Sequence, residues 1–253
     1  MPTSLRDTLS QKLRRFAPLR IAYRALLGGE GRERRRKFCV FYSQFIRPDD
    51  LVFDIGANIG VYAEAFQMIG ARVVSVEPNP ECSEQIYWTT KRDRVTVIPA
   101  AVGDRMGSCK LFVNELPILS SVSQEWVQGE KTAKPREVGM WHGEIEVPMV
   151  TIDSLVERYG MPHFIKLDVE GFEQAAMAGM SLQPKYLSFE FHAETLAKDE
   201  ACFNRLSRDT RYDFVINEPF NFEIGRWVTR EEVWERIKAA HISTFGDVFA
   251  KLE

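Results

Sequence analysis

The sequence predicts an α/β fold in which helices pack on both faces of a mostly parallel sheet. One observation behind this prediction is the regular alternation, after residue 50, of short β-branched apolar runs with longer segments of helical periodicity. The other is composition, because 253 residues with 45% hydrophobic and 27% charged side chains suffice for a buried core and exclude wholesale disorder. No internal repeat or low-complexity tract interrupts the pattern.

Residues 51–98 show the alternation most clearly. Short runs rich in Val, Ile and Phe predict strands at 51–55, 72–76 and 94–98. Between them, apolar residues at helical spacing predict helices at 59–69, which Gly70 ends, and at 80–90. Strands that alternate with helices of this length form right-handed βαβ units, so we expect neighbouring strands to be parallel.

The same alternation returns after residue 150. Thr151 and Asp153 can cap a helix that ends at Gly160, and Thr229 can cap a later helix. Apolar runs and helical periodicity predict strands at 163–169, 185–191 and 212–216, and helices at 151–160, 172–180, 193–208 and 229–240.

Residues 104–150 break the alternation, and we expect an insertion or lid there. Strands are predicted at 109–113 and 144–150, around a polar segment that contains Trp126 and Trp141. A long excursion of this kind in a compact domain is usually functional. We therefore expect residues 115–142 to determine substrate specificity, with the two tryptophans either stacking on a sugar or anchoring the loop.

Charge is unevenly distributed along the chain: residues 1–50, called the basic head below, carry an excess of positive charge, and residues 51–253, called the acidic body, an excess of negative charge. Residues 1–50 hold 12 Lys or Arg against 5 Asp or Glu, whereas residues 51–253 hold 21 against 31. An acidic body argues against nucleic-acid binding. We expect a helical extension at 1–50 and one domain at 51–253. The extension should comprise a helix at 5–16, a loop at 28–31 and a helix at 32–47 with a core-facing stripe of Phe38, Phe41, Tyr42 and Phe45.

Composition also bears on location and partners. No stretch approaches the ~18 apolar residues of a membrane span, and the N-terminus has no apolar h-region. The four cysteines are far apart and unpaired in sequence, which favours a reducing compartment, so a cytoplasmic protein is predicted. The basic head could meet an anionic acceptor, a membrane surface or a partner subunit. We favour a covering or oligomerising helix, which leaves a homo-oligomer open.

The first candidate site is a glycine loop followed by an acidic strand end. Residues 52–60 read Val-Phe-Asp-Ile-Gly-Ala-Asn-Ile-Gly, which predicts a strand, a tight turn and the start of a helix. Glycines in such a turn let a ligand approach the main chain closely. Glu77 ends the second strand, where a carboxylate can accept hydrogen bonds from a ribose diol.

This loop does not have the pattern of a phosphate cradle. Gly56 and Gly60 lie in a GxNxG pattern that lacks the third glycine of the dinucleotide fingerprint, and the Lys-Ser/Thr ending of a P-loop is absent. Asp54, at the strand tip, would repel a phosphate and suits a cationic or amino-bearing ligand. S-adenosylmethionine meets these demands, because it carries a ribose diol, an ammonium group and a sulfonium but no phosphate.

Four segments resemble the FkbM-type methyltransferases. They are residues 53–60 (Phe-Asp-Ile-Gly-Ala-Asn-Ile-Gly), 76–79 (Val-Glu-Pro-Asn), 99–104 (Pro-Ala-Ala-Val-Gly-Asp) and 165–173 (Ile-Lys-Leu-Asp-Val-Glu-Gly-Phe-Glu). The resemblance runs over residues 51–191, and the Lys-Leu-Asp-Val-Glu-Gly run is its most specific part. Members of this family are class I S-adenosylmethionine-dependent enzymes, largely O-methyltransferases that act on sugar or natural-product hydroxyls.

The resemblance implies a Rossmann-like class I methyltransferase fold, with a seven-stranded sheet that has one antiparallel edge. It also implies that residues 56–60 face the methionine moiety, that Glu77 holds the ribose, and that Ala101 and Val102 flank the adenine. The expected cofactor-binding residues are Asp54, Gly56, Ala57, Asn58, Gly60, Glu77, Pro78, Asn79, Ala101 and Val102.

The second candidate site lies at the ends of two later strands. Period-2 alternation in residues 164–170 puts Lys166, Asp168 and Glu170 on one face, and Glu190 and His192 share a face in the next strand. Open parallel sheets bind ligands outside the carboxyl ends of their strands. If these two strands are neighbours, the five side chains converge near the transferable methyl group.

Methyl transfer to a hydroxyl requires alignment of the reactants and removal of a proton. Asp168 or His192 is the candidate base, and Lys166 could hold a carboxylate ionised or orient a substrate oxygen. Glu170 and Glu190 could accept hydrogen bonds from sugar hydroxyls. The alternative is a structural ion pair between Lys166 and Glu170, with Glu170 capping the following helix.

The same residues leave other functions open. Asp168, Glu190 and His192 offer the oxygen and nitrogen donors that Mg²⁺ or Mn²⁺ accepts, although we do not favour a metal site. The predicted function is an S-adenosylmethionine-dependent O-methyltransferase with a small-molecule or saccharide acceptor. The alternatives are a catalytically silent cofactor-binding or scaffold protein of the same fold and, less favoured, an NAD-dependent oxidoreductase, against which the missing glycine argues.

Overall fold

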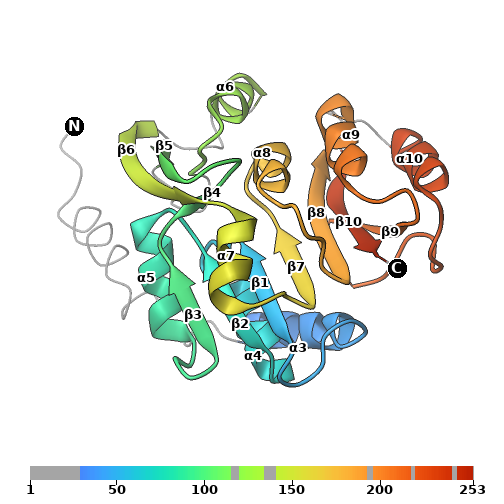
Figure 1. Cartoon of the computed structure of the whole chain (residues 1–253), viewed down its shortest axis with the longest axis horizontal. Coiled ribbons are helices and arrows are strands. Elements are labelled where there is room, and N and C mark those ends of the chain that lie inside the picture. Colours follow the sequence, from blue (N-terminus) through green and yellow to red (C-terminus); the bar gives the residue numbers. More distant parts are fainter. Residues whose placement is uncertain are drawn as a thin grey trace.

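The computed structural model describes residues 29–114, 120–133, 141–192, 196–217, 220–240 and 244–252. Its centre is a seven-stranded sheet with the strand order β3-β2-β1-β7-β8-β10-β9 (Figure 1). The strands are β1 (Leu51–Ile55), β2 (Arg72–Val76), β3 (Val95–Ile98), β7 (Phe164–Leu167), β8 (Tyr186–His192), β9 (Arg211–Ile216) and β10 (Phe245–Lys251). Every neighbouring pair is parallel except the two pairs that involve β10. The predicted mostly parallel sheet is therefore confirmed.

Helices cover both faces of this sheet. One face packs against α3 (Gly29–Tyr42), α4 (Val61–Ile69) and α5 (Pro80–Thr89), and the other against α7 (Ile152–Tyr159), α8 (Glu173–Ala178), α9 (Leu196–Arg205) and α10 (Arg230–Lys238). Side chains alternate between the two faces along each strand, so Phe53 and Ile55 belong to the second core and Val52 to the first. The sheet is thus buried on both sides, and its ligand-accessible part is the edge where the strands end.

Residues 101–150 form a small second sheet over the carboxyl ends of the first three strands (Figure 1). It consists of β4 (Ala101–Val102), β5 (Gly107–Asn114) and β6 (Trp141–Val150) in the order β4-β6-β5, accompanied by α6 (Gln124–Ala133). The two predicted strands of this insertion are confirmed. The insertion also contains α6, a helix that the sequence patterns do not predict.

The predicted burial of the aromatic stripe in the N-terminal part is confirmed, but the helix that carries it, α3, ends at Tyr42 rather than at residue 47, so Phe45 follows the helix. Phe38, Phe41, Tyr42 and Phe45 are all buried and pack with α4 and the sheet in one core. The loop predicted at 28–31 is wrong at residues 29–31, because α3 begins at Gly29, where a glycine in the first helical turn is tolerated. The predicted helix at 5–16 lies outside the described residues.

The family resemblance misplaces the antiparallel strand. It implies an antiparallel edge, whereas β10 lies one position inside the edge, between β8 and β9, and is antiparallel to both. The sequence patterns also miss β10 itself. Its seven residues include Gly246 and Asp247, which have low strand propensity, so pairing on both sides determines its structure.

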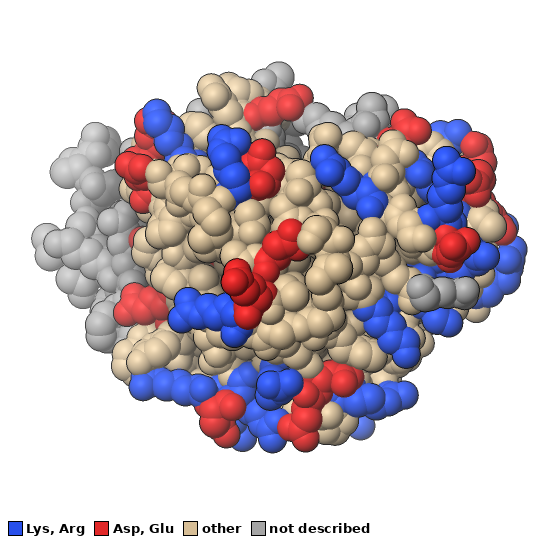
Figure 2. All heavy atoms as spheres, in the orientation of Figure 1, with Lys and Arg blue, Asp and Glu red and all other residues tan. Residues whose placement is uncertain are grey.

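The surface in Figure 2 carries basic and acidic side chains side by side around a broad area of other residues. Within the described residues, the view shows no extended patch of a single charge sign on this face. None of the described helices is both long and apolar enough to cross a bilayer. All four cysteines are free thiols.

Candidate active site at the carboxyl edge of the sheet

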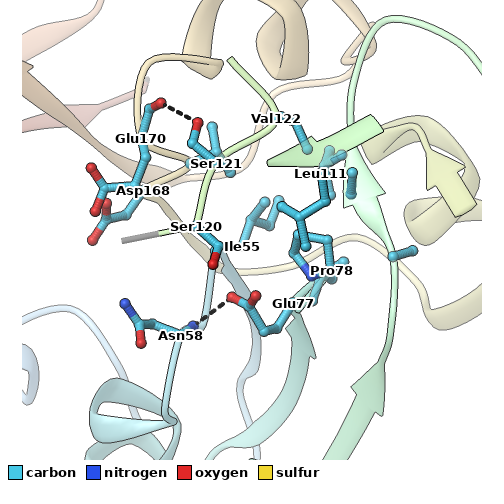
Figure 3. A pocket seen from close by; sticks show the side chains of 16 residues that line it. Ile55, Asn58, Glu77, Pro78, Leu111, Ser120, Ser121, Val122, Asp168 and Glu170 are labelled. Atoms are coloured by element: carbon cyan, nitrogen blue, oxygen red, sulfur yellow. Dashed lines mark hydrogen bonds between the residues drawn. The ribbon is translucent and has the colours of Figure 1, made fainter. Parts of the chain in front are cut away.

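A pocket of about 560 Å³, part of it open to solvent, lies at the carboxyl ends of β1, β2 and β7 (Figure 3). Its wall combines the strand ends with the loop after β1, the short strand β4, and a segment of the insertion. The lining residues are Ile55, Gly56, Asn58, Val76, Glu77, Pro78, Ala100, Ala101, Val102, Leu111, Ser120, Ser121, Val122, Asp168, Val169 and Glu170. Both predicted sites therefore contribute to one pocket.

The loop between β1 and α4 is held by main-chain hydrogen bonds. The N–H groups of Gly56 and Ala57 both donate to the carbonyl of Val76 on the next strand, at 2.9 and 3.1 Å. Gly56 has a φ of +77°, and a Cβ atom there would lie 1.6 Å from the carbonyl oxygen of Asp168. Only glycine satisfies both the left-handed backbone and this close approach. The glycine thus lets the loop lie directly against the end of β7.

Glu77 is an acidic group of the pocket that two main-chain N–H groups hold. One carboxylate oxygen accepts the N–H of Asn79 at 2.7 Å, and the other accepts the N–H of Asn58 at 2.8 Å (Figure 3). Burial raises the pKa of Glu77 to about 7, although the two N–H donors oppose the shift. Each carboxylate oxygen can accept a further hydrogen bond, so the group can bind two neighbouring hydroxyls of a ligand.

Part of the pocket wall is apolar. Ala101 and Val102 are buried, and Leu111 and Val122 from the insertion line the same pocket. A wall of this kind suits a flat, weakly polar ring. The apolar wall and the Glu77 carboxylate together match a nucleoside, with its base on one side and its ribose hydroxyls on the other.

Two serines connect the insertion to both ends of the pocket. The Ser120 hydroxyl accepts a hydrogen bond from the Asn79 side-chain amide at 3.1 Å, and the Ser121 hydroxyl donates to the Glu170 carbonyl at 2.9 Å (Figure 3). The first contact fixes the segment near Glu77, and the second fixes it near the end of β7. Sequence reasoning missed both serines, because no short motif links Ser120 and Ser121 to partners that are 41 and 49 positions away.

Lys166 and Asp168 form the central ion pair of the second group. The ammonium of Lys166 lies 2.7 Å from a carboxylate oxygen of Asp168 and 4.2 Å from the centre of the Tyr62 ring. Burial opposes its charge, but the carboxylates of Asp168 and Asp247 raise the pKa of Lys166 well above its ordinary value. The lysine side chain is only 2% exposed, whereas that of Asp168 is 28% exposed and reaches the pocket.

Glu190 and His192 form a second pair on the neighbouring strand. Their side chains lie 3.2 Å apart, between the imidazole Nε2 and a carboxylate oxygen. Burial and the nearby Asp168 carboxylate raise the pKa of Glu190, which His192 opposes. Neither residue lines the pocket. The prediction that the two strands are neighbours is confirmed by the pairing of β7 with β8.

Glu173 is a buried carboxyl that sequence reasoning left without a role. It accepts the N–H of Val169 at 2.9 Å and that of Gly171 at 3.4 Å, so it closes the turn that contains Glu170. Burial and the neighbouring Glu190 raise the pKa of Glu173 to about 7. Glu173 belongs to the same sequence motif as Glu170. Its role in closing the turn depends on the conformation of that turn, which the motif does not specify.

The predicted common face of Lys166, Asp168 and Glu170 is wrong for its last member. The strand was expected to reach residue 169, but β7 ends at Leu167 and Glu170 has a left-handed φ of +53°. Period-2 alternation holds only inside a strand. Glu170 reaches the pocket from the following turn instead. The alternative role as a helix cap also fails, because no side chain caps the N-terminus of α8.

The structure separates the predicted site residues into three groups. Those that line the pocket are Gly56, Asn58, Glu77, Pro78, Ala101, Val102, Asp168 and Glu170. Those that do not are Asp54, Ala57, Gly60, Asn79, Lys166, Glu190, His192 and Trp141. Trp126 belongs to α6, but its side chain lies outside the described residues.

Asp54 shows why position at a strand tip does not ensure ligand contact. It is 1% exposed and pairs in register with Lys166, on the sheet face that α3 and α4 cover. Burial raises its pKa to about 7, which the Lys166 ammonium opposes. Asp54 is therefore a buried titratable group beneath the pocket rather than a contact within it.

A metal site is not supported by the geometry. Among the residues that the structure describes, no three His, Cys, Asp or Glu side chains are arranged to hold a metal ion. The set of Asp168, Glu190 and His192 therefore does not meet the requirement for ligand number and distance.

The chain is similar to one known family and to several solved structures. The methyltransferase FkbM domain family matches residues 54–224. Among solved structures, the chain is similar to precorrin-6Y C5,15-methyltransferase from Geobacter metallireducens GS-15, with 12% identity over 85% of this chain and 87% of that one and a TM-score of 0.44. It is also similar to a TehB-like SAM-dependent methyltransferase from Corynebacterium glutamicum ATCC 13032, with 9% identity over 86% and 88% of the two chains and a TM-score of 0.42.

A third similar structure is a SAM-dependent O-methyltransferase from Thermotoga maritima, with 10% identity over 85% of this chain and 64% of that one and a TM-score of 0.40. No curated protein matches the chain significantly. The family match alone covers more than half of the sequence and includes every strand end that forms the pocket. The chain belongs to the FkbM family of methyltransferases.

Proposed function

We propose that this S-adenosylmethionine-dependent methyltransferase transfers a methyl group to a hydroxyl of a saccharide or other small natural-product acceptor. Family membership supports the methyltransferase class and the methyl donor. The observation that carries the choice of a hydroxyl is Asp168, a partly exposed carboxylate that lines the pocket and is held by a buried lysine. A hydroxyl acceptor must lose a proton during methylation, and a positioned carboxylate can take it.

The pocket residues fit the donor. The two free acceptor positions of Glu77 match the ribose diol, and the apolar wall that includes Ala101 and Val102 matches the adenine. Gly56 has no side chain, so a ligand can approach the main chain between these groups and Asp168. Carboxylates also dominate the charge around the pocket, which favours a ligand that carries an ammonium and a sulfonium.

S-adenosylmethionine supplies a methyl group on a positively charged sulfur, so the leaving group needs no protonation by the protein. The contribution of the chain is to align the acceptor and to remove its proton. We assign proton removal to Asp168 rather than His192, because only Asp168 lines the pocket and His192 is paired with Glu190. Lys166 holds the Asp168 carboxylate in place from beneath.

Two measurements on the full chain test this function. Isothermal titration calorimetry with S-adenosylhomocysteine should show one binding site. Labelled S-adenosylmethionine should then transfer its methyl group to members of a panel of methyl glycosides and other alcohols, and mass spectrometry and NMR should identify an O-methyl ether. Products methylated only on amines would contradict the proposal. Cofactor binding without methylation of any panel member would favour the silent cofactor-binding protein instead.

A further inference from the structure

Phe245 and His192 form a partly exposed aromatic pair at the start of β10 and the end of β8. The two residues are partners in the antiparallel register of these strands. Their rings are stacked, with centroids 6.1 Å apart and an interplanar angle of 24°. Phe245 is 44% exposed and the His192 side chain 40% exposed. The pair therefore presents aromatic surface to solvent at the edge of the sheet.

Backbone contacts connect this pair to the neighbouring strand β9. The carbonyl of Phe245 accepts the N–H of Asn217 at 2.9 Å, which ties the residue to the end of β9. The next residue, Gly246, lies so close to β9 that a Cβ atom would be 1.9 Å from the carbonyl oxygen of Val215. Close contact on one side and strand pairing on the other fix the direction of the Phe245 side chain. A surface fixed in this way needs little ordering when a ligand binds.

The aromatic pair shares a sheet face with the proposed base. Phe191 faces the α7–α10 side of the sheet, so alternation places Glu190 and His192 on the opposite face, where Lys166 also lies. Leu167 of β7 is the register partner of Phe189 of β8. Asp168 and Glu190 are the next residues in the two chains, so they lie at the same level along the sheet. Adjacent strands lie about 5 Å apart, and Phe245 lies two residues beyond Asp247, the β10 partner of Glu190, so its position is about 12 Å from that of Asp168. One or two sugar rings span this distance.

The chemistry of the pair limits what it can bind. An exposed phenylalanine forgoes the gain from burial, which a ligand with an apolar face can restore. The Glu190 side chain is 18% exposed and only one of its carboxylate oxygens pairs with His192, so the other oxygen is a hydrogen-bond acceptor next to the same surface. A pyranose ring has an apolar C–H face and hydroxyls along its edge, and it therefore matches both features at once.

We propose that Phe245 and His192 are the acceptor platform of this enzyme, on which one ring of a saccharide stacks while Glu190 accepts a hydrogen bond from a ring hydroxyl. This assignment rests on the proposed O-methylation of a hydroxyl acceptor and adds the class of acceptor and the residues that select it. Phe245 was not among the site residues that the sequence predicts, because β10 itself was missed.

Saturation-transfer NMR on the full chain with S-adenosylhomocysteine tests the platform directly. The probes are the methyl glycosides of common hexoses and 6-deoxyhexoses, maltose, and a phenol as a flat alternative. In the wild-type protein, saturation should reach the C–H protons of one face of a sugar ring. Phe245→Ser should weaken this transfer about tenfold, because it removes the stacking surface, whereas Phe245→Tyr should retain it.

Steady-state kinetics with the best acceptor give the second measurement. Phe245→Ser should raise KM for the acceptor about tenfold and leave KM for S-adenosylmethionine unchanged, since the platform does not contact the cofactor pocket. Tyr87→Ala is the matched control, because Tyr87 is a comparably exposed aromatic residue on α5, away from this edge. This control should change neither constant.

The outcomes separate the platform from the function on which it rests. Failure to bind S-adenosylhomocysteine would overturn the proposed function, while sugar binding that depends on Phe245 would still support the platform. An unchanged acceptor KM in Phe245→Ser would overturn the platform and leave O-methylation standing. Binding of the phenol but of no sugar would overturn the saccharide assignment, as would cofactor binding with no Phe245-dependent sugar signal.

Discussion

The two ends of the pocket are built in different ways. At the β1–β2 end, main-chain groups set the geometry, since the N–H groups of Asn58 and Asn79 hold Glu77 and the carbonyl of Val76 holds the glycine loop. At the β7–β8 end, charged side chains set it, since Lys166 holds Asp168 through an ion pair beneath the pocket.

This difference predicts separate consequences for binding and for chemistry. Main-chain contacts persist when a nearby side chain changes, so the β1–β2 end should bind the cofactor with little dependence on substitutions in β7 or β8. Buried charges influence one another over several ångströms, so each change at the β7–β8 end should alter the protonation of its neighbours. Substitutions at the two ends should therefore affect different kinetic constants.

The largest effect is expected from Asp168→Asn. The amide keeps the size of the carboxyl but cannot accept a proton, so kcat should fall by about 10³-fold, within the range typical of a lost general base. The affinity for S-adenosylhomocysteine should change little, because Glu77 and the glycine loop are untouched. Pre-steady-state methyl transfer and calorimetry on the same preparation measure the two quantities.

Asp209→Asn serves as the control for this substitution, since Asp209 lies exposed in the turn before β9. It should leave both turnover and cofactor affinity unchanged. A loss of cofactor affinity in Asp168→Asn as large as its loss of turnover would show that the two ends of the pocket are not independent.

A somewhat smaller effect, on stability, is expected from Lys166→Met. The methionine fills a similar volume, but the buried carboxylates around it lose their counter-charge, which should lower the free energy of unfolding by ~3 kcal/mol. Asp54 and Asp247, whose pKa values the Lys166 ammonium lowers, should also hold their protons to higher pH. Urea denaturation measures the first effect and its pH dependence the second.

Lys185→Met is the matched control, because Lys185 is exposed just before β8. It should change the free energy of unfolding by less than about 0.5 kcal/mol. If Lys166→Met were as stable as this control, the ion pair beneath the pocket would not organise the β7–β8 end.

Glu77→Gln should weaken cofactor binding by a smaller free energy. The amide can still accept one hydrogen bond, but its NH₂ group faces a main-chain N–H donor and leaves it unpaired. The loss of one charged acceptor should lower the affinity for S-adenosylhomocysteine about 30-fold, which corresponds to ~2 kcal/mol. At saturating cofactor, kcat should be nearly unchanged.

Calorimetry measures this change, with Glu84→Gln on the exposed side of α5 as the control that should bind normally. Wild-type affinity in Glu77→Gln would remove the ribose assignment, while the fold and the family would stand.

The sequence is most predictive where structure depends on neighbouring residues. β1 and β2 begin and end at the predicted residues, because short runs of Val, Ile and Phe buried on both faces need no distant partner to be recognised. β10 and α6 were missed for the opposite reason. Gly246 and Asp247 weaken the strand pattern, and Gly129 interrupts the helical one, so tertiary contacts determine both elements.

The same distinction applies to the site. The position of Glu77 after β2 could be predicted, because the residue that ends a strand follows directly from the strand pattern. The pocket contacts of Ser120 and Ser121 could not, because they come from an insertion whose path the sequence does not specify. The role of Glu173 depends on a turn in which Glu170 is left-handed, and no propensity predicts that conformation.

The smallest expected effect concerns the pH dependence of stability. Asp54 ionises with a pKa of about 7 in the folded protein, because burial outweighs the attraction of Lys166, and near 3.8 in the unfolded chain. Between these values the folded state binds the proton and the unfolded state does not, so unfolding releases a proton and stability falls as pH rises. Asp54→Asn removes this proton from both states. The free energy of unfolding of the variant, relative to wild type, should therefore increase by about 1 kcal/mol per pH unit within this window.

Urea denaturation of both proteins at several pH values between about 5 and 7 measures this difference. A difference that stays constant with pH would mean that Asp54 is ionised throughout. The charge beneath the β7–β8 end would then be one unit more negative, and Asp54 would join Asp168 and Asp247 as a charged neighbour of Lys166. The presence or absence of this slope therefore determines whether Asp54 competes with Asp168 for the buried lysine over this pH range.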